Sequence, residues 1–252
     1  MPRQGELVIL AEEPADDPSV PEPERVPPAA PLAEARLCPR CPGEGKAAEA
    51  DHAAVFALLR QVAPNRRAME RGVLRLRRLP GLVLAGIAGD RLVIVLRNSC
   101  AMETRSEGMD VFAEDALIYT RLTVEPGRAR MQSWINRARF SLHALERLVE
   151  RSTCALGSDF LGVVDGEAAA LLKRCLAGGM IEHDGDSYLR AKEEGVWAGS
   201  LDLTLPEADW GVLTQPEARV PTFSVRTFLE PDEMKPCVWL RWQDDPRLSL
   251  AA

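Results

Sequence analysis

The stretch LVLAGIAGDRLVIVLR, residues 82–97, decides the fold class. Two apolar runs flank Gly89 and Asp90, and a Gly-Asp pair between such runs is a signal for a two-residue β-hairpin turn. We therefore predict two antiparallel strands, residues 82–88 and 91–97. A hairpin of this kind is the basic unit of an antiparallel sheet.

The segments on either side of the hairpin extend this pattern. Before it, Asp51 is predicted to cap a short helix that Pro64 ends. After it, Asp165 is predicted to cap a later helix, and Asp184 with Gly185 marks a second hairpin. Long parallel βαβ units are not apparent, and we find no internal sequence repeat. The predicted fold class is therefore α+β, an antiparallel sheet or sheets with a few packing helices.

After residue 64, the spacing of the apolar residues predicts which segments are strands and which are helices. The expected strands are residues 73–79, 82–88, 91–97, 116–124, 131–140, 196–205, 222–229 and 237–242. The expected helices, residues 142–151 and 167–176, lie between the two groups of strands.

The charge and proline distributions separate an N-terminal segment from the rest of the 252 residues. Residues 1–45 contain ten of the 19 prolines, and residues 1–35 carry six of the seven net negative charges. Such a segment cannot bury enough apolar surface to order itself. We predict a disordered acidic tail over residues 1–45 and a globular α+β body over residues 46–252, with an alternative sub-boundary near residues 125–140.

The sequence lacks the features that identify several classes of protein. Six cysteines are too few for a disulfide scaffold, and no run approaches the ~20 apolar residues of a membrane span. We therefore expect a cytoplasmic protein with no membrane partner. The chain has no GxGxxG, Walker, HExxH or GxSxG pattern, which argues against nucleotide-triphosphate hydrolases, nicotinamide enzymes and zinc hydrolases. No cofactor is predicted.

Cys38 and Cys41 have the CxxC spacing of a metal-binding knuckle. A structural zinc ion needs four ligands, and the chain has no second CxxC. We therefore predict no metal site. The two remaining interpretations are that these residues form a flexible thiol pair or that they have no specific role.

The candidate catalytic feature is a stripe of His143, Arg147 and Arg151, spaced four residues apart on a predicted helix. A neutral imidazole is what a general base requires, and two guanidinium groups at this spacing can hold a phosphate. The alternative is a solvated helix face on which these arginines form ion pairs with Glu146 and Glu150.

The segment SLHALERLVER, with a strand before it and a helix and strands after it, resembles the His-xxx-Arg-xxx-Arg helix of small bacterial toxin-like domains. Those domains are similar to the barnase–EndoU–colicin–RelE ribonucleases, and the resemblance covers residues 140–242. It implies a metal-independent endoribonuclease in which His143 is the general base or acid and Arg147 and Arg151 bind the scissile phosphate. Polar residues of the sheet complete such sites, and Ser224 and Arg226 are of the matching kind.

Four further residues are predicted to contact a substrate. Arg137 and Arg139 belong to an arginine-rich segment with no acid between Glu125 and Glu146, which suits a phosphate backbone. Thr227 lies beside Arg226 on its predicted strand. Trp197 lies between two glycines and is predicted either to stack on a base or to fill the core.

Two functions follow from these patterns. The first is the metal-independent, toxin-like ribonuclease, acting on RNA. The second is a non-catalytic accessory protein of a mobile element, which uses its arginine surface to bind a nucleic acid or another polyanion, or a protein partner through its acidic tail. Geometry separates them, because the ribonuclease needs His143 and Arg226 to converge on one concave site.

Overall fold

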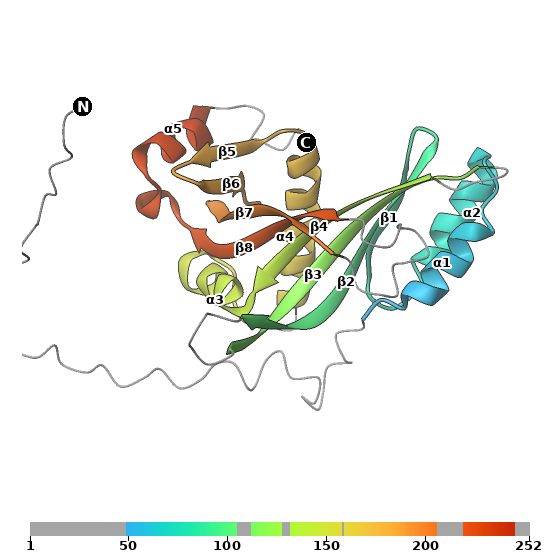
Figure 1. The fold of residues 1–252 in the computed structure, drawn as a ribbon, viewed down its shortest axis with the longest axis horizontal. Coiled ribbons are helices and arrows are strands. Elements are labelled where there is room, and N and C mark those ends of the chain that lie inside the picture. Colours follow the sequence, from blue (N-terminus) through green and yellow to red (C-terminus); the bar gives the residue numbers. More distant parts are fainter. Residues whose placement is uncertain (1–48, 105–111, 128–131, 158, 206–218, 245–252) are drawn as a thin grey trace, which may run out of the picture. The chain divides into compact units, whose positions relative to one another are not determined.

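The computed structural model describes residues 49–104, 112–127, 132–157, 159–205 and 219–244 (Figure 1). The predicted tail, with Cys38 and Cys41, lies outside these residues. The predicted α+β class is confirmed: eight strands form one sheet in the order β1-β2-β3-β4-β8-β7-β6-β5, with helices packed on it. Every neighbouring pair is antiparallel except β4 and β8, which are parallel.

The element order contains a topological repeat that the sequence does not reveal. Two helices followed by a four-stranded meander occur twice, and the two meanders meet through β4 and β8. The first set is α1 (His52–Arg60), α2 (Arg66–Leu76), β1 (Leu82–Ala88), β2 (Arg91–Thr104), β3 (Phe112–Glu125) and β4 (Gln132–Ser141). The second is α3 (Leu142–Arg151), α4 (Phe160–Leu176), β5 (Met180–His183), β6 (Asp186–Arg190), β7 (Val196–Thr204) and β8 (Val220–Leu229). A 3-10 turn, Pro231–Glu233, and α5 (Pro236–Asp244) follow β8.

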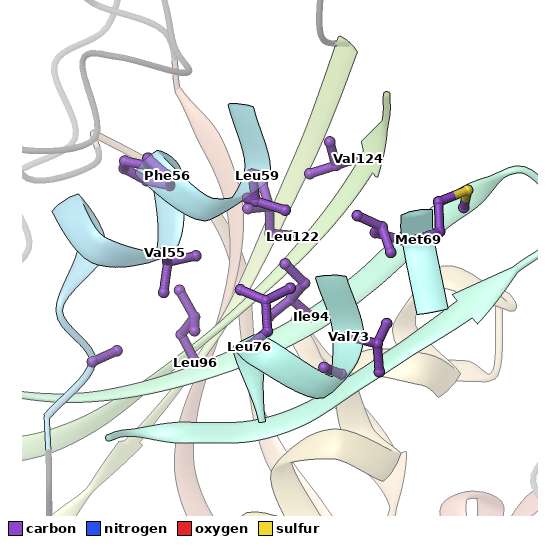
Figure 2. Close-up of a cluster of buried hydrophobic side chains, with 13 residues drawn as sticks. Val55, Phe56, Leu59, Met69, Val73, Leu76, Ile94, Leu96, Leu122 and Val124 are labelled. Carbon is purple, nitrogen blue, oxygen red and sulfur yellow. The ribbon is translucent and has the colours of Figure 1, made fainter. Parts of the chain in front are cut away.

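Helices α1 and α2 cover one face of the first meander (Figure 2). Asp51 caps α1 as predicted, because its carboxylate accepts a hydrogen bond from the backbone N–H of Ala54 at 3.0 Å. Apolar side chains at alternate positions of β2 and β3 face these helices, and we call this side of the sheet the α2 face. The core there consists of Ala50, Val55, Phe56, Leu59, Met69, Val73, Leu76, Ala85, Leu92, Ile94, Leu96, Leu122 and Val124.

The prediction of a strand over residues 73–79 is wrong, because residues up to Leu76 belong to α2. Met69, Val73 and Leu76 are buried at helical spacing, whereas Leu74, which the alternating pattern placed with Leu76, is 59% exposed. A short apolar-polar alternation fits both periods, and packing against the sheet decides between them.

Helix α4 covers the opposite side of the sheet, which we call the α4 face. It begins at Phe160, not after Asp165 as predicted, and Asp165 is therefore inside the helix. The Asp165 carboxylate accepts hydrogen bonds from Arg97 at 2.5 and 2.6 Å and from the Tyr119 hydroxyl at 2.8 Å. This partly buried network joins α4 to β2 and β3.

The predicted strand over residues 237–242 is also wrong, because these residues form part of α5. Val238 and Trp242 are one helical turn apart, and both belong to one buried cluster with Tyr188, Val196 and Ala198 of β6 and β7. Ala198 lies on the side of β7 opposite Trp197, which faces α4, so α5 packs on the α2 face. The helix pair and α5 therefore cover the two ends of this face, with β4 and β8 between them.

We expect Tyr119→Phe to flatten the alkaline loss of stability. Burial, and next the Asp165 charge, raise the pKa of Tyr119 well above its usual value near 10. The unfolded chain loses this proton above about pH 10 while the folded chain keeps it, so the stability from this tyrosine is complete below about pH 10 and falls as the pH rises further. Urea unfolding of both proteins at about pH 8 and pH 10.5 measures this difference. An equal pH dependence in the two proteins contradicts the prediction.

Candidate functional site

Helix α3 starts where the sequence predicts. Ser141 ends β4 and caps the helix, accepting a hydrogen bond from the backbone N–H of Ala144 at 3.1 Å. Leu145 and Leu148 are buried, and His143 is exposed near the first turn. The amphipathic helix therefore presents His143 to solvent, as the candidate site requires.

The two arginines of α3 are held by protein groups. Arg147 forms an ion pair with Glu150 at 2.6 Å, which is one of the pairings expected for a solvated face. Arg151 donates to the carbonyl of Phe228 at 2.7 Å and forms an ion pair with Glu233 at 2.6 Å. Arg151 thus ties α3 to the end of β8 and to the 3-10 turn, and its charge is already paired with a carboxylate.

Strands β4 and β8 bring several predicted residues together. In the parallel register Arg139 lies beside Ser224, and Arg137 lies beside Thr222. Alternation places these four side chains on the α2 face, because Ile135, two residues before Arg137, packs with the α1–α2 core. The α2 face of β4 and β8 is therefore polar at these positions.

Arg226 is the extra residue of a β-bulge in β8. Thr227 pairs with Ala198 and Val225 pairs with Gly199, so no residue of β7 opposes Arg226. Its guanidinium crosses β7 and donates to Asp186 of β6 at 2.8 Å. The guanidinium is therefore directed across β7 toward β6, whereas helix α3, which carries His143, contacts β8, β3 and β4.

Two substrate contacts from the sequence need correction. Trp197 is completely buried between the edges of Phe140 and Phe228, and its indole N–H donates to Glu167 at 3.0 Å. It fills the core, the second of its two predicted roles, and cannot stack on a base. Arg137 is only 5% exposed, so it does not present a guanidinium to an external polymer.

Arg139 remains as a partly exposed cation at the centre of the sheet. Its Nε is shielded from solvent and has no hydrogen-bond acceptor among the residues that the structure describes. On β8 its neighbour is Ser224, and Ser224 in turn pairs with Ser200 of β7. Sequence reasoning missed Ser200, because the register that brings it into this row is not readable from local periodicity.

Arg139, Ser224 and Ser200 form a row across three strands of the α2 face, which we call the central row. Thr227 is half-buried further along β8, and its hydroxyl makes a long contact, 3.4 Å, with the carbonyl of Phe228. The Ser200 hydroxyl donates to the Asp202 carboxylate at 2.9 Å, so the donors that the central row can offer to an anion are the Arg139 guanidinium and the Ser224 hydroxyl. It contains no general base.

Within the described parts of the chain, no cluster of three histidine, cysteine or acidic side chains could hold a metal ion. The same residues include no helix long and apolar enough to cross a bilayer. Comparison of the chain with protein-family models, curated proteins and solved structures finds no match. The functional argument therefore depends on the geometry of the chain itself.

Proposed function

We propose that the chain is a non-catalytic RNA-binding protein of the cytoplasm that contacts the phosphate backbone through the central row. The observation that carries this proposal is the partly exposed guanidinium group of Arg139, which forms no ion pair among the described residues and lies beside Ser224. Salt and water screen a half-buried guanidinium less than one at the open surface. A charge-assisted contact with a phosphate is therefore stronger here than at a solvated surface arginine.

The neighbouring groups suit a phosphate polymer better than an isolated ion. Ser224 and Ser200 continue the row from Arg139 across two further strands. Adjacent strands lie about 4.8 Å apart, so the row is about 10 Å long, more than one phosphate group occupies. The Arg139 guanidinium and the Ser224 hydroxyl, on adjacent strands of this row, can donate to successive parts of a single strand.

The same geometry supports binding over cleavage. In the ribonuclease alternative, Arg147, Arg151 and Arg226 would hold the scissile phosphate near His143. Each of these arginines instead forms an ion pair with a carboxylate of the protein. The carboxylate that pairs with Arg226 is on β6, two strands from β8. The toxin-like resemblance of α3 would then reflect an amphipathic helix with a similar charge pattern.

We expect Arg139→Gln to weaken binding of a labelled single-stranded oligoribonucleotide roughly tenfold, since one charge-assisted contact contributes about 1.5–3 kcal/mol. The slope of log affinity against log salt should fall by about 0.7, the value for one phosphate contact. Lys173→Gln is the matched control, because it removes one exposed positive charge from α4 on the other face. Fluorescence anisotropy at several salt concentrations measures both quantities.

The ribonuclease alternative is tested in the same samples. We expect the RNA to remain intact with the natural chain and with His143→Ala. Cleavage by the natural chain that His143→Ala abolishes would establish the ribonuclease instead. Equal affinities for Arg139→Gln and Lys173→Gln would remove the central row as the binding surface.

A further inference from the structure

A cysteine–histidine pair lies at the junction of α5 with the β5–β6 hairpin, outside the central row. Sγ of Cys237 is 3.0 Å from Nε2 of His183. Cys237 is the second residue of α5 and is exposed, and His183 is the last residue of β5. The sequence placed Cys237 at the start of a predicted strand, residues 237–242, whereas α5 presents it to solvent beside an imidazole.

The hairpin turn holds the histidine in place. Asp184 and Gly185 both have left-handed backbone conformations, with φ of 52° and 80°, as a two-residue turn of this type requires. Asp184 Oδ2 lies 3.1 Å from the same His183 nitrogen and 2.8 Å from Nζ of Lys235. Hydrogen bonding by Lys235, and then the charge of His183, lowers the pKa of Asp184.

The groups around Cys237 are of the kind found beside reactive thiols. His183 Nε2 lies within hydrogen-bonding distance of both the sulfur and the Asp184 carboxylate. Lys235 lies two residues before the cysteine, and Cys237 is in the first turn of a nine-residue helix, at the positive end of the helix dipole. Exposed cysteines beside histidine or lysine side chains are the reactive ones in proteins.

We propose that Cys237 is a site of reversible S-thiolation by low-molecular-weight disulfides, with His183 as its proton acceptor. Cys237 gives its proton to His183 Nε2, and the thiolate attacks one sulfur of the disulfide. A new S–S bond forms, the old S–S bond breaks, and the departing thiolate takes up the proton. Cys237 is oxidised and one sulfur of the reagent is reduced, so the exchange needs no other oxidant.

The other described cysteines lack these surroundings. Cys154 is buried, and burial followed by the charges of Glu193 and Glu167 raises the pKa of its thiol. Burial also raises the pKa of Cys175. Cys100 is half-buried on β2. The structure thus singles out Cys237 among them on exposure and on a contact with histidine together.

The test uses the full chain with Cys38→Ser and Cys41→Ser, so that the two remaining N-terminal thiols do not contribute. Oxidised glutathione is the probe, and mass spectrometry after digestion maps and times the mixed disulfides. We expect Cys237 to react first, and His183→Gln to slow its reaction roughly fivefold at neutral pH. His143→Gln is the matched control, because it removes an exposed imidazole from α3.

Repeating the reaction in concentrated urea tests whether the effect of His183 depends on the folded structure. The Cys237 reaction rates of the natural chain and of His183→Gln should become equal there, because the Cys–His contact exists only in the folded chain. The proposal is overturned if Cys100 reacts as fast as Cys237 in the folded protein. It is also overturned if His183→Gln and His143→Gln give equal Cys237 rates while both variants keep the natural thermal unfolding midpoint. Neither outcome bears on RNA binding.

Discussion

Glu167→Ala is expected to lower the free energy of unfolding by about 3–5 kcal/mol, because it leaves several buried donors without an acceptor. The Glu167 side chain is 1% exposed and lies under the turn between β6 and β7. Its carboxylate accepts hydrogen bonds from the backbone N–H groups of Lys192 and Glu193, at 2.8 to 3.0 Å, and from the Trp197 indole at 3.0 Å. One side chain therefore fixes both a turn and the largest buried aromatic residue.

Urea unfolding followed by tryptophan fluorescence measures this loss. Glu194→Ala is the matched control, since Glu194 is exposed in the same turn and its loss should change stability by less than about 0.5 kcal/mol. Glu167→Gln keeps one acceptor oxygen and should fall between the two variants. Equal stability of Glu167→Ala and Glu194→Ala would show that the turn does not depend on the buried carboxylate.

Gly199→Ala should also be strongly destabilising, by about 2–4 kcal/mol, because the position has no room for a Cβ atom. A Cβ on Gly199 of β7 would overlap the carbonyl oxygen of Ser224 and lie 3.2 Å from Cα of Val225. Both neighbours are backbone atoms of β8, so relief of the overlap requires the β7–β8 pairing to move. Ser224 belongs to the central row, so this change should also weaken RNA binding by the folded fraction.

Gly86→Ala is the control for this prediction. Gly86 is also within a strand, β1, but a Cβ there meets no heavy atom within 4 Å. Replacing glycine by alanine reduces the conformational entropy of the unfolded chain more than that of the folded strand. Gly86→Ala should therefore be neutral or raise the free energy of unfolding by up to about 1 kcal/mol. Thermal unfolding of the two variants side by side gives the comparison, and equal midpoints would contradict the argument from close packing.

Local signals in the chain predicted local structure well. The Gly89–Asp90 turn, the Asp51 cap and the Ser141 cap are present where expected, because each depends on residues within a few positions of one another. The strands over residues 73–79 and 237–242 were wrong for the converse reason. Short apolar patterns fit a helix and a strand equally, and only burial against the sheet distinguishes them.

The candidate site was predictable as a set of residue types and not as an arrangement. Arg139 and Ser224 are 85 positions apart, and only the parallel pairing of β4 with β8 makes them neighbours. The partners of Arg151 and Arg226 are likewise carboxylates from other elements, Glu233 and Asp186. Such partners decide whether an arginine is available to a phosphate, and spacing along one helix carries no information about them.

The sequence by itself determined the α+β class, the first hairpin and the amphipathic α3, because turn chemistry and side-chain periodicity act over a few residues. Only the tertiary structure decided that two meanders share one sheet, that Trp197 is core and that Cys237 meets His183. Each of these depends on strand register and helix docking, which are set by the burial of apolar surface contributed from the whole chain.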